Sequence, residues 1–567
     1  MWFKGSILFL LVTFLAVSHA YKLRFIQMTD LHGWIYGHSR QPRVFNATIA
    51  DIVAFQHEWC RTDEKPHLPE CITFDSGDLI EGTGLSDSTE PGGTYIFQFS
   101  EHLNFTANTI GNHDVFSTES AKWLEAHLSL FPNYVTTNFY TVSTDRTFGR
   151  RYRMHTTESG FRVLFFGFIY NYDNVDRTSY YIRDAVEVMN DDDIVQLLSD
   201  GQFDMIISLC HIGTDSPLVK GIVSKIREFT LKPIIMATGH THRFRHSDCI
   251  DVDGNSVENC TVIEAGRYME HLALYELDFE ADVNGVYHWV SKPELIGGLE
   301  QKLTTDFLGN LVGKSDIRQD WHWRAERLMG LVDDALEEQH IFREVGYLPK
   351  RYFAKEYFTE DDSVSYFWLQ KVFPYSIKPM ISYTEGNDEY VFFFNTLDAR
   401  ADLYKGMNTY DDLYSSFCFD IPLWNIFTLN GLTPQEVYYA VEKKEWKDVI
   451  PLPEKNPHYA PSTWYSDMDP GKHYTIAAAQ YNMNRFVRNL DAKFPDRTFS
   501  PNNTHYRMFY AFYDTVHSYH NPPKPFPWYT IYVAIGIVVV IAIVGLVMLK
   551  PKSKREIFTY ARIEEHL

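Results

Sequence analysis

The chain has 567 residues, of which 45% are hydrophobic and 22% are charged. This length exceeds the core of one typical domain, so at least two folded units are expected, and the composition leaves little room for long disorder. Lys and Arg number 52 against 74 Asp and Glu, and the resulting net charge of −22 disfavours nucleic-acid binding because it repels a phosphate backbone over most of the surface.

The N-terminus has the pattern of a cleaved signal peptide. Lys4 is followed by an apolar run over 7–17 and by the small residues Ser18 and Ala20 before Tyr21. A retained N-terminal anchor is the alternative, but the run is short for a membrane span. We therefore assign 1–20 to a signal peptide.

A second apolar stretch near the C-terminus predicts a transmembrane helix. Residues 529–549 are uncharged, follow a Pro-rich spacer over 519–528, and precede a basic tail over 550–567. Because basic residues mark the cytoplasmic side, the body is expected in the lumen or outside the cell. This predicts a single-pass type I membrane protein of the secretory or endosomal pathway, at the plasma membrane or in a vacuole or lysosome.

The six cysteines suit an oxidising compartment if most of them pair. Two local bridges, Cys60–Cys71 and Cys249–Cys260, are the simplest arrangement, although the sequence leaves the connectivity open. Cys210 and Cys418 lie in apolar runs and are equally compatible with buried free thiols. A lumenal body also agrees with four glycosylation acceptors, which are Asn46, Asn104, Asn259 and Asn502.

The body divides into two units of mixed α/β character. Over 21–300, short β-branched and aromatic runs alternate with helix-compatible stretches, which predicts a layered α/β unit. Residues 301–344 form a linker whose segment 324–339 has a helical apolar face, and Leu328, Leu331, Val332 and Leu336 lie on that face. A second unit follows over 345–518, with a strand at 391–394 and a capped helix start at Thr433.

Five short motifs follow apolar, strand-like runs. Loops at the carboxyl ends of strands converge in layered α/β sheets, so these side chains are expected to meet in one crevice. The motifs are Asp30-Leu31-His32, Gly77-Asp78, Gly111-Asn112-His113-Asp114, His211 and Gly239-His240-Thr241-His242.

The motifs offer nitrogen and oxygen ligands without thiolate, which suits zinc, manganese or iron. Their number suits two divalent ions, with Asp78 as the bridging carboxylate and a hydroxide nucleophile formed from bound solvent. Each motif alone is weak evidence for a metal site, because a lone histidine more often has a structural role. All five in one chain, with the tight glycine turns of the third and fifth, favour a metal site.

This order of motifs resembles that of the calcineurin-like metallophosphoesterase superfamily. The resemblance implies a four-layer α/β/β/α catalytic domain with two metal ions. It assigns Asp30, His32, Asp78 and His242 to one ion, and Asp78, Asn112, His211 and His240 to the other. Asn112 and His113 are implied to act in catalysis, with His113 as a histidine that is not a ligand.

The second unit is similar to the smaller α/β C-terminal domain of the 5′-nucleotidase branch. The similarity is carried by 395–419, with N-x-G-G-x-R-A-D and T-Y-x-D-L-Y as the family pattern, and by the run from Pro422 to Val437. It implies that Asn395 and Arg400 bind substrate.

Three departures from that branch concern the substrate and His113. Residues 396–398 replace paired glycines, and 477–486 replace the G-G-D-G loop that carries the base-binding aromatic residue. Phe116 stands where the branch often has an aspartate that orients the catalytic histidine. His113 therefore either lacks such a carboxylate or takes one from elsewhere.

We expect a two-metal hydrolase of phosphate esters, most similar to a 5′-nucleotidase acting on nucleotides or related compounds. One alternative is a phosphodiesterase or phosphatase acting on a non-nucleotide ester. Another is a catalytically silent membrane receptor or adhesion protein, which the complete ligand set disfavours. The sequence assigns no oligomeric state.

Overall fold

The computed structural model describes residues 21–41, 44–172, 175–354, 362–385, 389–395, 399–416, 425–441, 449–452 and 468–518. The predicted signal peptide, spacer, membrane span and cytosolic tail lie outside these ranges, as does Cys418. Within the described ranges, no helix has both the length and the apolar character needed to cross a bilayer.

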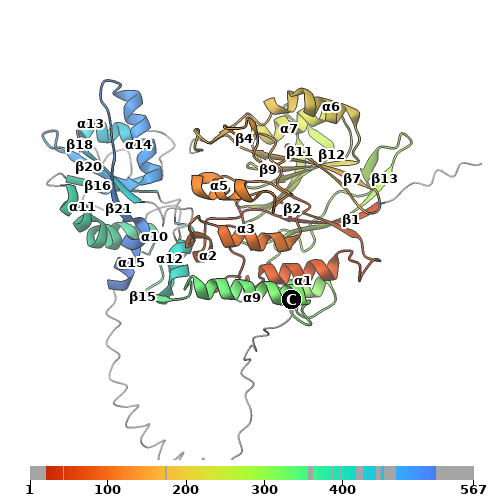
Figure 1. The fold of residues 1–567 in the computed structure, drawn as a ribbon, viewed down its shortest axis with the longest axis horizontal. Coiled ribbons are helices and arrows are strands. Elements are labelled where there is room, and N and C mark those ends of the chain that lie inside the picture. The colour runs from red at the N-terminus through yellow and green to blue at the C-terminus, as the bar shows by residue number, and fades with distance from the viewer. Residues whose placement is uncertain are drawn as a thin grey trace, which may run out of the picture.

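Two β-sheets form the centre of the first unit (Figure 1). The first sheet, in spatial order, consists of β14 (Tyr287–Trp289), β13 (Ala273–Ala281), β1 (Tyr21–Met28), β2 (Glu70–Asp75) and β3 (Ala107–Asn108). The second consists of β11 (Phe244–Ile250), β12 (Ser256–Ala265), β10 (Ile234–Thr238), β9 (Met205–His211), β7 (Arg162–Ile169) and β6 (Arg153–Thr156).

The sheets bury a shared apolar layer. Phe25 and Ile72 of the first sheet belong to one buried cluster with Phe165, Ile207 and Ala237 of the second. Side chains alternate between the two faces of a strand, so the neighbouring residues point instead to the outer helices. This alternation makes both sheets apolar on both faces.

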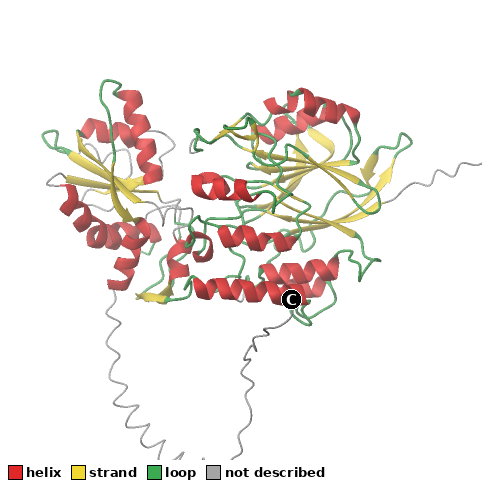
Figure 2. Ribbon diagram, in the orientation of Figure 1, coloured by secondary structure: helices red, strands yellow, loops and turns green. Residues whose placement is uncertain are grey.

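Helices cover both outer faces, which gives four layers (Figure 2). The first sheet is covered by α1 (Ile49–Trp59), α2 (Gly84–Asp87), α3 (Thr94–Ser100), α4 (His113–Phe116), α5 (Thr118–His127), α8 (Thr305–Leu311) and α9 (Trp323–Glu338). The second is covered by α6 (Asp192–Asp200) and α7 (Pro217–Arg227). Shorter elements are η1 (Glu101–Leu103), η2 (Glu187–Asn190) and a small sheet of β4 (Phe139–Thr141), β5 (Arg146–Thr147) and β8 (Tyr180–Ile182).

The linker helix α9 packs on α1. The prediction of its apolar face is wrong at one residue. Leu328, Val332 and Leu336 are buried as expected, but Leu331 is 40% exposed. The buried stripe instead includes Ala325 and Ala335. The pattern identified the helix, but it could not tell which side of a broad apolar face meets the neighbouring helix.

The second unit has its own sheet and two buried clusters. Its sheet consists, in spatial order, of β19 (Val449–Leu452), β16 (Glu389–Asn395), β20 (Tyr474–Ala479), β18 (Asn425–Leu432) and β21 (Asn502–Arg507). The remaining elements are β15 (Glu344–Leu348), α10 (Val364–Phe367), the π-helical η3 (Trp368–Ile377), α11 (Lys378–Glu385), β17 (Gly406–Thr409), α12 (Tyr410–Ser416), α13 (Pro434–Val441), α14 (Gln480–Lys493) and α15 (Met508–Ser518).

Two local sequence predictions are confirmed in this unit. The strand predicted at 391–394 lies within β16. The helix start at Thr433 forms a capping box, because Glu436 N donates to Thr433 Oγ1 at 3.3 Å and Thr433 N donates to Glu436 Oε2 at 2.9 Å.

Both expected disulfides are present. Cys60–Cys71 joins the end of α1 to β2, and Cys249–Cys260 joins β11 to β12. Cys210 is a buried free thiol on β9. Bridges of this kind suit a protein that folds in the secretory pathway.

Non-reducing peptide mapping of the purified full-length chain should recover both bridges, with Cys210 alkylated only after unfolding. Replacing Cys249 and Cys260 together by serine should lower the free energy of unfolding by about 2–4 kcal/mol, because the unfolded chain regains conformational freedom. Rapid alkylation of Cys60 or Cys249 in the native protein would contradict this pairing.

Candidate metal centre

The predicted ligands meet at the carboxyl edges of the two sheets. The strands β1, β2 and β3 run parallel to one another, as do β7, β9, β10 and β12, so their carboxyl ends lie at common edges. Asp30, His32, Asp78, Asn112 and His211 are each at most 2% exposed there. His240 and His242 follow β10 and are partly buried.

The ligand atoms form two groups. One consists of Asp30, His32 and His242, and the other of Asp78, His211 and His240, with the atoms of each group within 4.8 Å of one another. Asp78 Oδ2 lies 3.0 Å from His211 Nε2 and 3.6 Å from His32 Nε2. Asp78 therefore belongs to one group and also faces the other, as a bridging ligand must.

Hydrogen bonds to backbone carbonyls fix two of the imidazoles. His32 Nδ1 donates to Glu81 O at 2.8 Å, and His211 Nδ1 donates to Ser76 O at 2.9 Å. When the ring is neutral with its proton on Nδ1, the Nε2 lone pair of each ring points into the site. His32 Nε2 lies only 3.1 Å from His242 Nε2, a contact that a shared cation explains.

The electrostatics of the two groups also suit divalent ions. Burial lowers the pKa of His32 and of His240 to about 4, so both rings are neutral near pH 7. For His211, burial opposes protonation, but the carboxylates of Asp78 and Asp30 outweigh it and raise the pKa to about 10. Asp78 Oδ2 and His211 Nε2 are both buried, and beyond the 3.0 Å contact between them neither has a hydrogen-bond partner among the described residues. A metal ion would satisfy both atoms in place of that proton, so the donor set fits the implied ions.

Five of the predicted ligands have a strained backbone conformation. Asp30, His32, Asp78, His240 and His242 have φ values of 52°, 47°, 60°, 76° and 60°, in the left-handed region that residues other than glycine rarely adopt. Each such residue costs about 1–3 kcal/mol, and strain of this kind clusters at functional sites.

Two glycines and Asp114 bring the loops together. A Cβ atom on Gly111 would lie 2.0 Å from Asp78 Oδ1, and one on Gly239 would lie 2.3 Å from Thr29 Oγ1, so only glycine allows this approach. The Asp114 carboxylate accepts hydrogen bonds from the N–H groups of Asp78 and Gly111 at 2.9 and 2.7 Å. Asp114 thereby joins the second and third motifs.

His113 takes its carboxylate from Glu81. Glu81 Oε2 lies 2.6 Å from His113 Nδ1. Phe116 contributes only a ring contact, with its ring centroid 4.7 Å from that of the imidazole. Glu81 also fixes His32, whose Nδ1 donates to its carbonyl group. The sequence analysis missed Glu81, although an acidic residue three positions after a Gly-Asp motif was a usable signal.

Tyr170 is a second residue that the sequence analysis missed. It follows β7, its hydroxyl donates to Asn112 Oδ1 at 3.3 Å, and its ring lies 4.4 Å from that of His240. The contact places the Asn112 side chain beside the second ligand group. No local pattern around Tyr170 marks it in the sequence.

The two predicted substrate-binding residues belong to the second unit. Arg400 is partly buried, and its N–H donates to Ser416 O at 3.3 Å. Burial is the main cause that holds the pKa of His113 well below its usual value, and the charge of Arg400 adds to this lowering. Asn395 ends β16, and its side chain is outside what the structure describes.

No family model matches the chain. It is 23% identical over 456 residues to an uncharacterized protein of Saccharomyces cerevisiae, covering 78% of this chain and 73% of that protein. It is 28% identical over 261 residues to a secreted protein of Arthroderma benhamiae, covering 44% of this chain and 38% of that protein.

The solved structures show the fold. A 5′-nucleotidase of Candida albicans superposes with a TM-score of 0.69 at 18% identity, covering 87% of this chain and 98% of that one. A 5′-nucleotidase precursor of Thermus thermophilus gives 0.60 at 14% identity, covering 88% and 97%. The sulfate thiohydrolase SoxB of the same bacterium gives 0.56 at 12% identity, covering 88% and 94%. The chain thus has the two-domain mixed α/β fold of 5′-nucleotidases, which confirms the resemblance seen in the sequence.

The full-length chain, loaded with zinc or manganese and freed of excess metal, should retain about two ions per molecule by mass spectrometry. Asp78→Asn should lose at least one of them, because a neutral amide is a poor bridge between two cations. Asp248→Asn, at a surface carboxylate paired with Lys292, serves as the control. Retention of both ions by Asp78→Asn would contradict the bridging role.

Proposed function

We propose that this chain is a two-metal hydrolase of phosphate esters, acting as a 5′-nucleotidase-like phosphomonoesterase on nucleotides or related compounds. The observation that carries the proposal is the pair of adjacent ligand groups, one of which contains Asp78. The His113–Glu81 pair lies beside them, and the chain has the fold of 5′-nucleotidases. The proposed units are a catalytic domain over 21–300, a linker over 301–344 and a C-terminal domain over 345–518.

Asp30, His32, Asp78 and His242 would hold one ion, and Asp78, Asn112, His211 and His240 the other. Divalent ions supply Lewis-acid stabilisation of the phosphoryl charge and activation of the attacking water. Zinc, manganese and iron all suit this nitrogen and oxygen set.

His113 and Glu81 form the proton-handling pair of the proposed mechanism. Glu81 Oε2 would hold the proton on His113 Nδ1 and orient the ring, with Nε2 directed at the leaving oxygen. In its charged form His113 would donate the Nε2 proton to that oxygen as the ester bond breaks. Asn112 would orient the transferred phosphoryl group, and Arg400 would clamp a phosphate or other anion from the second unit.

A phosphatase or phosphodiesterase of non-nucleotide esters is the second candidate, and one observation favours it. The chain from Tyr474 to Lys493, where the branch carries its base-binding loop, passes directly from β20 into α14. A catalytically silent receptor or adhesion protein is the third candidate. The presence of all the predicted metal ligands argues against it.

We further propose a lumenal or extracellular body on a single type I membrane span. The two disulfides and the secreted relative support passage through the secretory pathway. The span itself rests on the sequence of 529–549.

The test of the function is ester hydrolysis by the purified full-length chain, followed as phosphate release and, for the diesters, as formation of the monoester product, with and without added zinc or manganese. The panel contains nucleoside monophosphates, nucleotide diphosphate sugars, cyclic nucleotides and an aryl phosphate. Metal-dependent hydrolysis of nucleotides is the expected result. Hydrolysis of the aryl ester alone would remove nucleotide specificity, and no hydrolysis by the metal-loaded chain would contradict the proposal.

Glu81→Ala should lower kcat by at least about tenfold, since His113 loses the group that orients it. KM and metal content should change little, because the Glu81 carbonyl that holds His32 is retained. Glu81→Gln should lose less activity, as its amide oxygen can still accept from Nδ1. Glu338→Gln, at a carboxylate that accepts from Tyr95 on the surface, is the control. A wild-type kcat in Glu81→Ala would show that the His113–Glu81 pair does not act in proton transfer.

Arg400→Ala should raise KM by about tenfold or more at nearly constant kcat, the loss expected for a charged hydrogen bond to an anion. Arg400→Lys should recover part of the affinity as a point charge without the bidentate geometry. If the alanine variant keeps the wild-type KM on every ester hydrolysed, Arg400 is not the clamp.

A further inference from the structure

The carboxylate of Asp411 connects the second unit to the first. Asp411 is on α12 and only 4% exposed. Its Oδ1 atom accepts two hydrogen bonds from the first unit, from Tyr36 Oη at 2.5 Å and from Gly84 N at 2.9 Å. Because a buried carboxylate is costly unless it is hydrogen-bonded, these donors favour a single docked position of α12.

The two donors come from the loops that carry the metal ligands. Tyr36 follows the loop of Asp30 and His32, and Gly84 follows the loop of Asp78. The loops are bonded to each other, since His32 N donates to Asp78 O at 3.0 Å. Thr83 Oγ1 also donates to the carbonyl of Gly33 at 3.1 Å. One oxygen atom of the second unit thus contacts both ligand loops.

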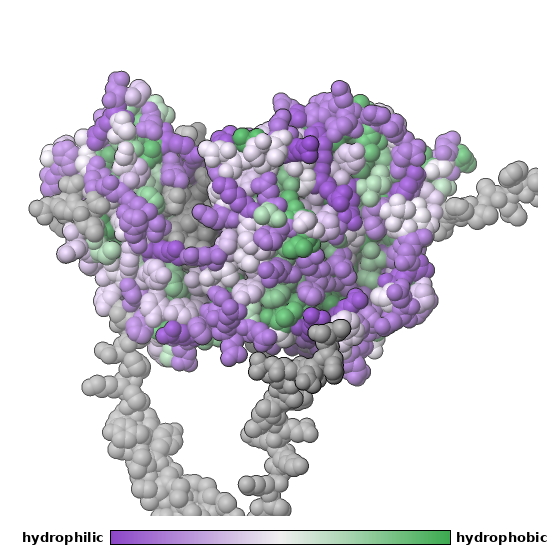
Figure 3. All heavy atoms as spheres, in the orientation of Figure 1, coloured by the Kyte–Doolittle hydropathy of each residue, from purple (hydrophilic) through white to green (hydrophobic). Residues whose placement is uncertain are grey.

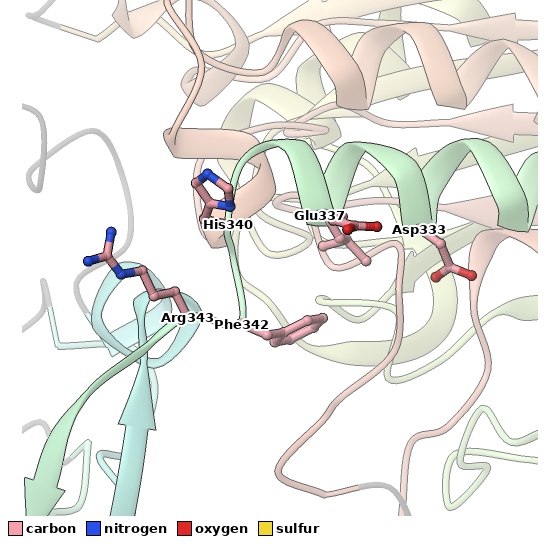
Figure 4. A pocket seen from close by; sticks show the side chains of 6 residues that line it. Asp333, Glu337, His340, Phe342 and Arg343 are labelled. Carbon is pink, nitrogen blue, oxygen red and sulfur yellow. The ribbon is translucent and has the colours of Figure 1, made fainter.

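The glycine at position 84 suits the close approach of α12. A Cβ atom there would lie 3.0 Å from Ile341 Cγ2 and 3.1 Å from Asp411 Oδ1, closer than ordinary van der Waals contact. On its other side, Asp411 N donates to Ile341 O at 3.0 Å. Ile341 belongs to the connector after α9, which borders a pocket of about 360 Å³ lined by His340, Phe342 and Arg343 among others (Figure 4).

The neighbouring carboxylate reinforces the same contact. Arg40 of the first unit donates to Asp412 through both Nε, at 2.6 Å, and Nη2. The same Nη2 donates to Met407 O at 2.7 Å. Asp412 also caps α12 by accepting from Thr409 N at 2.7 Å. The start of α12 is therefore held by two adjacent side chains.

The other end of α12 holds Arg400. The carbonyl of Ser416, the last residue of the helix, accepts the N–H of Arg400 at 3.3 Å. We propose that Asp411 is a positioning residue, which docks α12 on the two ligand loops and thereby fixes the position of Arg400, the anion clamp of the proposed function. Substrate anions then meet the guanidinium and the metal site together. This inference rests on the proposed function.

Asp411→Ala in the full-length chain should raise KM about tenfold while kcat stays within about threefold, as Arg400 moves away from the centre. Asp411→Asn should behave like wild type, because its amide oxygen can accept both hydrogen bonds, and Tyr36→Phe should give an intermediate KM. The matched control is Asp514→Ala, which removes a carboxylate that accepts from Tyr506 within the second unit at 2.6 Å. A fall in kcat at constant KM would overturn the proposal.

A double-mutant cycle separates positioning from general destabilisation. If Asp411 acts through Arg400, then Asp411→Ala should change KM by less than about twofold in the Arg400→Ala background. A full tenfold effect in that background would overturn the proposal.

Hydrogen exchange tests the docking without any substrate. In Asp411→Ala, the peptide that contains the Gly84 amide should exchange at least about tenfold faster than in wild type, and in Asp514→Ala it should not. Unchanged exchange in Asp411→Ala would overturn the inference. Faster exchange in Asp411→Ala, in a case where the wild-type chain hydrolyses no ester, would uphold the docking and refute only the proposed function.

Discussion

The buried carboxylate of Asp78 is the constraint on which the rest of the site depends. One oxygen, Oδ1, accepts the N–H of His113 at 2.8 Å, while Oδ2 faces the imidazoles of His211 and His32. Burial acts to raise the pKa of Asp78, but the imidazoles of His211 and His113 outweigh it and hold the pKa well below its usual value. A carboxylate that stays charged while buried from water requires cations nearby, and the surrounding loops are arranged around this carboxylate.

The fold supplies the stability for this arrangement. Two sheets that share a buried apolar layer hold the strand ends rigidly, so the loops can keep ligands in left-handed backbone conformations. The loops are tied to each other through Asp114 and to the second unit through Asp411. Outside these contacts, the face of both units in Figure 3 is largely hydrophilic, as the acidic composition indicates.

The fold and the convergence of the predicted ligands could be predicted because these residues follow apolar strands, and this pattern is local in the sequence. Tyr170 and Asp411 could not, because their contacts join segments far apart in the chain. Glu81 had a local signal in its place after Gly-Asp, but its pairing with His113 depends on the paths of two loops. The exposed Leu331 shows the same limit, since a helical pattern does not identify the neighbour. Substrate identity depends on the second unit, where this sequence departs from the 5′-nucleotidase pattern.

Anomalous diffraction from crystals of the full-length chain grown with zinc or manganese tests the central claim most directly. The account predicts two peaks roughly 3.5–4 Å apart. One should be coordinated by Asp30, His32 and His242, and the other by Asn112, His211 and His240, with Asp78 bound to both. A single peak, or two peaks that Asp78 does not bridge, would contradict it.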